Sequence, residues 1–292
     1  MYQYEPQTLK KLQNTEKEIL KKFDAICQKY HIEYFVVFGT ALGAIRHQGF
    51  IPWDDDIDVG MLRSEYEKLK SVPKKEWEDL ILSDAYKRDK KHVLIYPQLY
   101  KNGTIFETAY HHKYDKKSSE EMLPIWIDIF IYDCVSSISE VKRKYKKAHF
   151  LRKMFYYSKC GTKVYKEDSL KRRFSCVAKD CVHKLLTLQK NTDLRIYQRY
   201  LDVVAKGQGS LVTTFDTSVL KEILNSVCSY EEMFPTIRVP FEDIMVSIPK
   251  NYDQMLKQIY GDYMKLPPVE KRNNHPPKIL DFGDGNGNVI SE

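Results

Sequence analysis

The sequence has no apolar run of the roughly 18 to 20 residues needed to cross a bilayer. Its first residues, MYQYEPQTLKKLQNTEKE, also lack the apolar centre of a secretory signal. The six cysteines form no C-x-x-C pair and no cluster with histidine, which argues against a zinc site and a disulfide scaffold. We therefore expect a cytoplasmic protein with reduced, mostly buried thiols.

Two further patterns are missing. Gly207-Gln208-Gly209 lacks the third glycine and the preceding strand of a dinucleotide-binding fingerprint. No helix-turn-helix, zinc-finger or RNP-like pattern accompanies the net charge of +7, so no nucleic-acid partner is expected. What the chain does have is 292 residues, 42% of them hydrophobic, which is enough for a sizeable core.

A strand followed by a glycine turn opens the most informative stretch. Residues 34–38, YFVVF, are β-branched and aromatic enough for a buried strand, which stops at Gly39-Thr40. The following ALGAIRH has helical character. Such a junction directs free backbone N–H groups and the positive end of the helix dipole outward, and the glycine permits close approach of a ligand. The turn therefore suits a phosphate group.

Four aspartates in five positions follow this helix, at residues 54, 55, 56 and 58. If residues 54–61 form a strand, then Asp54, Asp56 and Asp58 share one face, and Asp55 shares the other with Ile57 and Val59. Three carboxylates on one face repel each other unless a cation lies between them. Ligation by oxygen alone favours Mg²⁺, Mn²⁺ or Ca²⁺.

Two other interpretations of the acids are weaker. A calcium loop would need glycine at its sixth position, where this sequence has Val59. A solvated acidic turn would leave Trp53, Ile57 and Val59 exposed without reason.

One more aspartate stands out in the segment WIDIFI, residues 126–131. Asp128 is embedded in an otherwise apolar strand, where an unpaired carboxylate is unfavourable. A shared metal or a partner cation would explain it, and a structural salt bridge is the alternative. Asp133 has the opposite parity, and we expect it to face a loop.

The residues now support a resemblance. FGTALGAIRHQGFIPWDDDIDVGM, residues 38–61, resembles the signature of the LicD-type phosphocholine transferases, which are related to fukutin and fukutin-related protein and belong to the nucleotidyltransferase-fold superfamily. IYGDYMKLPPVEKRNNHP, residues 259–276, is similar to the C-terminal motif of that family. The resemblance covers residues 17–134 and 234–288 and leaves the middle uncovered. It implies an α/β (α+β) fold, in which helices flank a small mixed sheet that carries the acids.

The resemblance also implies roles for individual residues. The superfamily carries a Gly-Ser or Gly-Thr turn, an Asp-x-Asp pair and a third carboxylate on a later strand. Here Asp56, Asp58 and Asp128 would be the catalytic residues and would hold Mg²⁺, with Mn²⁺ as the alternative. Further expected contacts to the substrate are Gly39, Thr40, Arg46, His47, Asp54, Lys101, Arg272 and His275. For Arg46 and His47 the alternative is a basic helix C-terminus, for Lys101 a solvated turn, and for Arg272 and His275 a packed C-terminal loop.

The middle of the chain is basic. Residues 140–190 hold sixteen Lys and Arg against four acids, a local balance of +12 that leaves about −5 for the rest. Val141, Ala148, Leu151 and Phe155 recur at helical intervals, so this part begins as an amphipathic basic helix. We expect a catalytic core at 1–137, a basic helical insertion at 138–210, and a C-terminal part, 211–292, that completes the core.

The insertion suits an anionic acceptor or the inner face of a membrane, and a purely solvated helical surface is the alternative.

Other elements are expected from periodicity. Helices are predicted at 9–30, 194–204 and 252–260, and strands at 81–83, 93–100 and around 237–248. Lys101-Asn102-Gly103-Thr104 predicts a hairpin turn between the strand at 93–100 and the next one.

The function that the resemblance implies is metal-dependent transfer of phosphocholine from CDP-choline to a sugar hydroxyl, with release of CMP. The acceptor would be a cell-surface glycan or a teichoic-acid precursor. CDP-ethanolamine, CDP-glycerol or CDP-ribitol as donor would use the same chemistry. Trp53 and Trp126, near the acids, could contribute to an aromatic cage for a quaternary ammonium. A non-catalytic anion-binding module is the alternative from another class, but clustered acids would not help it.

Overall fold

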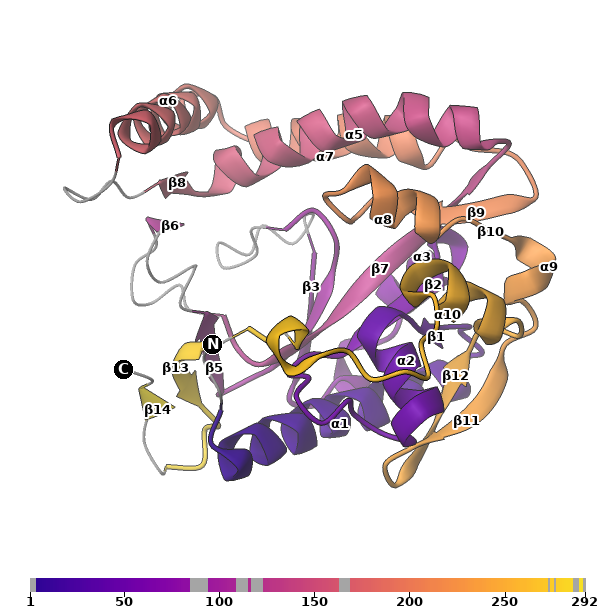
Figure 1. Cartoon of the computed structure of the whole chain (residues 1–292). Coiled ribbons are helices and arrows are strands. Elements are labelled where there is room, and N and C mark those ends of the chain that lie inside the picture. The colour runs from indigo at the N-terminus through magenta and orange to yellow at the C-terminus, as the bar shows by residue number, and fades with distance from the viewer. Residues whose placement is uncertain are drawn as a thin grey trace.

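The fold is a mixed sheet with helices on both sides (Figure 1). The computed structural model describes residues 4–84, 94–108, 115–116, 123–162, 169–272, 274–275, 277–285 and 289–290. The main sheet contains β1 (Phe35–Val36), β2 (Asp58–Leu62), β7 (Trp126–Val135), β4 (Gln98–Lys101) and β3 (Leu80–Ser83) in that order, with β9 (Leu211–Thr214) and β10 (Cys228–Ser229) joined through β7. The expected class, a mixed α/β sheet flanked by helices, is confirmed.

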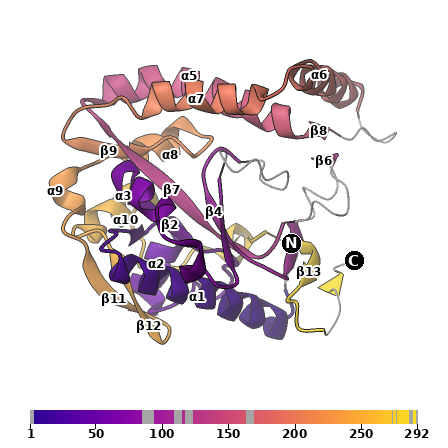
Figure 2. The same ribbon diagram turned by 180° about the vertical axis from the view of Figure 1, so that it is seen from behind.

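Strand β7 is the central strand, and its sequence WIDIFIYDCV explains why. It is ten residues long and rich in aromatic and β-branched residues, so it can pair over its whole length. On one side it runs parallel to β2. On the other side its first half pairs with β4 and its second half with β9, both antiparallel. Figure 2 shows β7 crossing the molecule between these partners.

The remaining elements surround this sheet. The helices are α1 (Pro6–Lys29), α2 (Phe38–His47), α3 (Arg63–Lys70), α5 (Ile138–Lys159), α6 (Leu170–Thr187), α7 (Thr192–Val204), α8 (Leu220–Asn225), α9 (Tyr230–Met233) and α10 (Tyr252–Tyr260). Smaller sheets pair β11 (Ile237–Phe241) with β12 (Ile244–Ile248), β6 (Asp115–Lys116) with β8 (Gly161–Thr162), and β13 (Pro277–Asp281) with both β5 (Ile105–Thr108) and β14 (Val289–Ile290).

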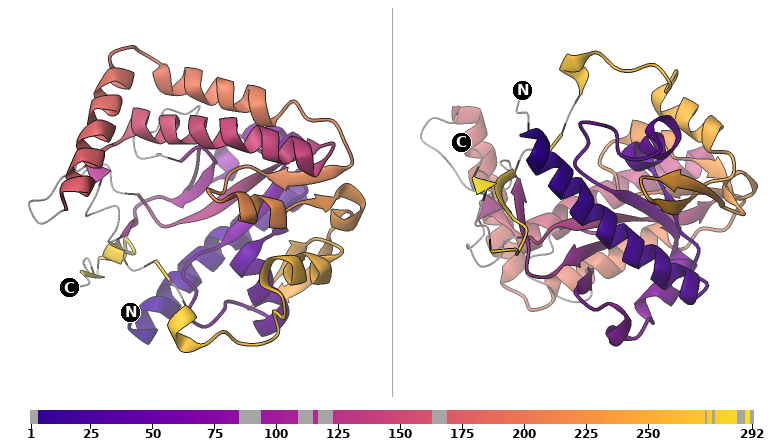
Figure 3. Two further views of the ribbon diagram at one scale, coloured as in Figure 1. Left: turned by 45° about the horizontal axis from the view of Figure 1, so that its top comes forward. Right: turned by 90° about the horizontal axis from the view of Figure 1, so that it is seen from below.

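Helix α1 covers one face of the sheet, as its apolar spacing predicts. Leu12, Ile19, Leu20 and Phe23 are fully or almost fully buried and share a core with alternate residues of β7. Figure 3, seen from below, shows α1 lying across the sheet. The other residues of β7 therefore face away from α1, toward the side where Asp58 and Asp128 project.

The basic middle of the chain forms a helical layer. Helices α5 and α7 lie side by side, and α6 crosses their ends (Figure 3). The amphipathic prediction for α5 is confirmed, because Val141, Ala148, Leu151 and Phe155 are buried.

Two hydrogen bonds to Asp216 fasten this layer to the sheet. Tyr200 of α7 donates to Oδ1 at 2.8 Å, and the backbone N–H of Ile131 in β7 donates to Oδ2 at 2.9 Å. The boundaries proposed for this segment, 138–210, place it between two strands of one sheet.

The predicted hairpin at residues 101–104 is wrong. Strand β4 pairs with β3 and β7, whereas β5 pairs with β13 in a separate sheet. The reason is local. The Thr104 hydroxyl donates to the Lys101 carbonyl at 2.7 Å and accepts from the Ile125 N–H at 2.9 Å, so the chain leaves β4 beside the start of β7.

Two smaller expectations also need correction. The strand predicted for residues 54–61 starts only at Asp58, and residues 54–57 are irregular. Asp133 does not face a loop. It lies within β7, is 4% exposed, and accepts two hydrogen bonds from Arg63 at 2.6 and 2.7 Å. A buried carboxylate on a strand needs such a partner, and the partner comes from α3, distant in sequence.

All six cysteines are thiols outside any disulfide, and Cys27, Cys160 and Cys176 are buried. Among the described residues, none of the helices combines the length and apolar character of a membrane span.

Candidate active site

Asp58 and Asp128 face each other across two neighbouring strands. In the parallel ladder of β2 and β7, Asp58 is the register partner of Asp128. Register partners in a ladder project from the same face of the sheet, so the two carboxylates converge. Gln98 is the partner of Asp128 on the other side, and its Nε2 donates to Asp128 Oδ1 at 2.7 Å. The sheet therefore sets the orientation of the third carboxylate.

The strand expected at residues 34–38 is only Phe35–Val36, and Gly39 and Thr40 lie in the first turn of α2 and not in a turn before it. From there they position the acids. The Thr40 hydroxyl, which is buried, accepts a hydrogen bond from the Asp58 backbone N–H at 2.8 Å. A Cβ at Gly39 would lie 2.7 Å from the Asp54 carboxylate. A side chain at this position would therefore displace the Asp54 carboxylate. Both predicted turn residues lie at the site, and each contacts an aspartate.

The acids lie close enough together to shift one another's pKa. The pKa of Asp58 is raised well above its ordinary value, first by burial and then by the charges of Asp56, Asp128 and Asp54. The pKa of Asp54 is raised by burial and then by Asp56. The pKa of Asp128 rises to about 7, mainly through burial, although the hydrogen bond from Gln98 opposes the rise. The structure therefore brings Asp54, Asp56, Asp58 and Asp128 together, although only Asp58 and Asp128 are in strands.

Sequence reasoning missed a further acid in this cluster. Glu16 of α1 is 3% exposed, and its Oε2 is buried without a hydrogen-bond partner. Burial raises its pKa most, followed by the charges of Asp56 and Asp55. The sequence could have indicated this acid, because Glu16 lies four residues after Leu12 on the apolar face of the helix, where a purely apolar core would not contain a carboxylate.

Asp55 has a structural role that the sequence did not indicate. It is 2% exposed and accepts hydrogen bonds from the Tyr4 hydroxyl at 2.6 Å and the His275 backbone N–H at 2.7 Å. His275 Nδ1 also lies 3.2 Å from Asp55 Oδ1 and 3.5 Å from Asp56 Oδ2. Asp55 thereby joins the first residues of the chain and the C-terminal motif to the aspartate loop.

His275 is close to the acids, as the resemblance predicts. Its pKa rises to about 9, first through the hydrogen bond to Asp55, against the effect of burial, and then through the charge of Asp56. Asp55, Asp56 and His275 offer ligand atoms within 4.8 Å of one another. However, a protonated imidazole donates hydrogen bonds and cannot ligate a metal. Without a bound cation, His275 therefore suits a phosphate at neutral pH, and a cation beside Asp55 and Asp56 would oppose its protonation.

Three other basic residues near the C-terminal motif lie together. Arg46 donates to the Tyr263 carbonyl at 2.7 Å and to His47 Nε2 at 2.9 Å. The guanidinium of Arg272 lies 4.3 Å from the ring centroid of Trp53, and its charge lowers the pKa of Arg46 further after burial. Burial, followed by the Arg46 charge, also lowers the pKa of His47. Arg46, His47 and Arg272 form one basic group beside the site.

Lys101 is not brought to the site. It forms an ion pair with Asp79 at 2.8 Å. It also lies three residues beyond Gln98 along β4, about 10 Å from the level of Asp128.

A pocket of about 640 Å³ opens beside Asp58. Its walls come from several parts of the chain that are distant in sequence. They include the aromatic side chains Phe38, Phe130 and Tyr260, the charged groups Lys221, Glu222 and His275, and the segment that leads into α8. The apolar strand and helix patterns gave no signal that Phe130, Lys221 and Tyr260 line a common pocket.

The donor set suits a hard divalent cation. Asp56, Asp58 and Asp128 offer carboxylate oxygens, and the charge of Asp56 raises the pKa of both Asp58 and Asp128. A cation among them would remove this repulsion, and oxygen-only ligation favours Mg²⁺ or Mn²⁺. By their chemistry these carboxylates fit the metal that the resemblance implies, although the group of described residues whose ligand atoms lie within 4.8 Å of one another is Asp55, Asp56 and His275.

Comparisons with known proteins place the whole chain in one family. A sequence model of the family described as LicD/FKTN/FKRP, nucleotidyltransferase domain, matches residues 31–189. The lipopolysaccharide cholinephosphotransferase LicD of Haemophilus influenzae is 32% identical over 281 residues, which are 92% of this chain and 96% of that protein. An uncharacterized protein of Rickettsia prowazekii is 38% identical over 55 residues, 19% of this chain and 21% of that one.

Together, the sheet, the paired carboxylates and these similarities define a phosphotransferase with a nucleotidyltransferase-type domain. The chain belongs to the LicD family. The matched region extends to residue 189, so the similarity continues into the basic segment that the sequence motifs left uncovered.

Proposed function

We propose that this protein transfers phosphocholine from CDP-choline to a sugar hydroxyl of a lipopolysaccharide-type glycan or another cell-surface glycan precursor. The observation that carries the proposal is the similarity to the Haemophilus influenzae cholinephosphotransferase over almost the whole of both chains. The pairing of Asp58 with Asp128 across β2 and β7, with Asp58 in the lining of the pocket, supports it.

In the proposed reaction, the acceptor hydroxyl oxygen attacks the β-phosphorus of CDP-choline. The bond from this phosphorus to the bridging oxygen breaks, and CMP leaves with that oxygen. The acceptor proton passes to a base, and the product is a phosphodiester between choline and the sugar. Such a transfer depends mostly on positioning and on neutralising phosphate charge.

The residues of the site divide this work. Asp56 and Asp58 would hold Mg²⁺, which, when bound, neutralises charge on the diphosphate. Asp128 has a pKa of about 7 and an orientation fixed by Gln98, which suits it to receive the acceptor proton or to complete the metal site. His275, together with the group of Arg46, His47 and Arg272, would bind the donor phosphates.

The pocket also offers a place for a quaternary ammonium. Phe38 and Phe130 meet edge to face with 5.0 Å between ring centroids, and Tyr96 stacks on Phe130 at 5.0 Å. Tyr260 joins Phe38 and Phe130 in the pocket lining, beside the Asp58 carboxylate. A choline headgroup is recognised by aromatic faces and negative charge.

The two tryptophans first considered for this role have other partners. Arg272 covers Trp53, and Trp126 lies edge to face with Phe106 at 5.2 Å.

The test is to incubate the protein with Mg²⁺, a glycan acceptor and one CDP-linked donor at a time, and to measure CMP. The donors are CDP-choline, CDP-ethanolamine, CDP-glycerol and CDP-ribitol. Preferred release of CMP from CDP-choline, dependent on metal and acceptor, supports the proposal. Preferred release of CMP from another donor would change the assigned phospho-group and leave the proposed reaction type in place. Release of CMP from none of the four donors would overturn the donor and the reaction type together.

A further inference from the structure

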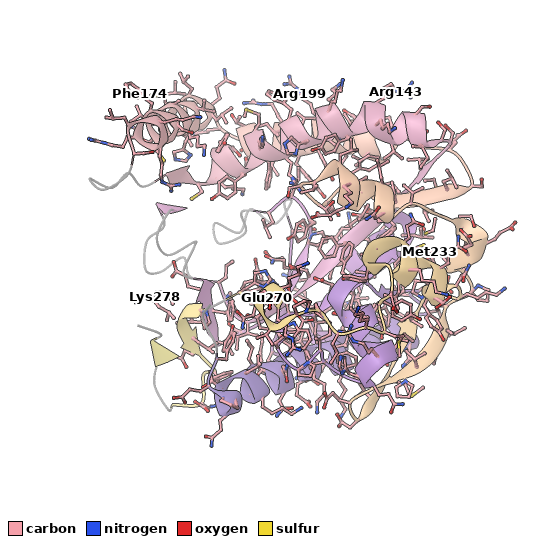
Figure 4. The ribbon with its side chains drawn as sticks, viewed as in Figure 1. Arg143, Phe174, Arg199, Met233, Glu270 and Lys278 are labelled. Atoms are coloured by element: carbon pink, nitrogen blue, oxygen red, sulfur yellow. The ribbon has the colours of Figure 1, made fainter. Side chains whose placement is uncertain are left out.

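Helix α6 exposes a continuous apolar stripe. Leu170, Phe174 and Leu185 are 72%, 77% and 66% exposed, and Val177 and Leu188 are 53% and 78% exposed. Figure 4 shows Phe174 on α6, at the outer edge of the molecule. Surface residues of this size are normal when scattered, but a contiguous row of them marks an interaction surface.

Their spacing places these residues on one side of the helix. At about 100° per residue, positions 170, 174, 177, 185 and 188 fall within an arc of about 80°. The opposite side packs against the helical layer. Cys176 is buried there, and His183 Nδ1 lies 2.7 Å from the Tyr157 carbonyl of α5. The packing of the inner face therefore fixes the apolar stripe in its outward orientation.

Positive charge borders the stripe on both sides. On the same helical wheel, Lys171 lies on one flank, and Arg173 and Lys184 lie on the other. Helix α6 holds five Lys and Arg and a single acid, Asp180, which pairs with Lys184 at 3.3 Å. Long cationic side chains beside an apolar stripe can extend their charged ends toward phosphate groups while the apolar residues insert.

We propose that α6 binds in the interface of an anionic membrane, with Leu170, Phe174, Val177, Leu185 and Leu188 below the headgroups and Lys171, Arg173 and Lys184 at the level of the lipid phosphates. The helix would lie parallel to the surface, as an interfacial helix does. This inference does not depend on the proposed reaction.

Charge decides between a membrane and a second copy of this chain. An isologous contact through α6 would bring the same five cations of each copy together, and like charges at close range oppose association. An anionic bilayer accepts the apolar stripe and the cations at once. The wider segment, residues 140–190, has a net charge of +12, so it also attracts an anionic membrane at long range.

The experiment is sedimentation of the full chain with vesicles of phosphatidylcholine, with and without phosphatidylglycerol. The apolar variant carries Leu170→Ser and Phe174→Ser, and the charge variant carries Lys171→Gln and Arg173→Gln. The matched control carries Ile237→Ser and Met245→Ser on β11 and β12, which are 37% and 44% exposed and lie at the opposite corner of the molecule (Figure 1). Thermal unfolding of each variant verifies that it folds.

We expect the wild type and the control to bind only vesicles that contain phosphatidylglycerol. The apolar variant should bind at least about tenfold more weakly, because two large side chains no longer insert. The charge variant should also bind more weakly, and its loss should shrink as ionic strength rises.

Unchanged vesicle binding by the folded apolar variant would overturn the proposal. Loss of self-association in that variant, measured by light scattering without vesicles, would instead assign the stripe to a second copy. Equal loss in the control would make the effect non-specific and would overturn the proposal as well.

Discussion

Asp58 and Asp128 occupy paired positions on two adjacent parallel strands, and their carboxylates project from the same face of the sheet. The charge of Asp128 raises the pKa of Asp58, and the charge of Asp56 raises the pKa of both. Gln98 fixes the orientation of Asp128 from the next strand. Two half-buried carboxylates held this way repel each other in the apo protein, so the arrangement requires a functional reason.

Replacing Asp58 with Asn should abolish metal-dependent release of CMP while leaving the melting temperature in EDTA equal to or higher than that of the wild type. Asn keeps the size of the side chain but removes one of the repelling charges. Asp202→Asn is a matched control, since Asp202 is on the exposed surface of α7, where it pairs with Lys206. Wild-type activity in Asp58→Asn would refute the metal assignment.

Asp128→Asn should lower turnover by at least about a hundredfold, as expected for removing a base or a metal ligand. Enzyme kinetics with CDP-choline and circular dichroism of the same sample test this. If Asp128 were only a structural residue, the variant would unfold at a lower temperature yet keep its activity below that temperature.

Glu16→Gln should raise the stability of the metal-free protein at neutral pH, because the variant no longer buries an ionisable acid beside the charges of Asp56 and Asp55. The same change should weaken Mg²⁺ binding if Glu16 faces the bound cation. Thermal unfolding in EDTA and calorimetric titration with Mg²⁺ measure the two effects separately. A variant that is less stable in EDTA would show that Glu16 is satisfied by the protein itself.

Glu140→Gln tests the junction between β7 and α5. The Ser136 N–H and hydroxyl, and then Lys144, lower the pKa of Glu140 to about 2. A folded pKa below the ordinary 4.5 contributes stability that is present above about pH 4.5 and lost as the pH falls through about 2. The variant should therefore melt a few degrees lower, about 2–4 °C, at pH 7 and converge with the wild type near pH 2. An offset that does not change with pH would contradict this origin.

Tyr260→Leu should raise the KM for CDP-choline more than the KM for CDP-glycerol. Tyr260 lines the pocket with Phe38 and Phe130, and a leucine fills similar space without an aromatic face for the trimethylammonium group. The side chain is 41% exposed, so folding should be little affected. Equal changes for both donors would place Tyr260 near the shared part of the substrate, away from choline.

Local chemistry determined the part of the site that lies within short segments. Three features could be recognised from the sequence alone: the Gly39-Thr40 pair after an apolar run, the cluster of aspartates, and Asp128 within an apolar strand. Each of these patterns is unusual by itself. The helical spacing of α1, α5 and α10 was readable for the same reason, since it depends only on side chains three and four residues apart.

Only the tertiary structure decided what these segments meet. Sequence could not show that Asp133 pairs with Arg63, that β5 leaves β4 to pair with β13, or that the aspartate charges raise the pKa of Glu16, because each interaction joins residues far apart in the chain. The same holds for the pocket shared by Phe38, Phe130 and Tyr260. On α6, the sequence showed charge, but packing against α5 decided which side of the helix remained exposed. The burial of a side chain depends on which elements pack together, and the topology of the chain determines this packing.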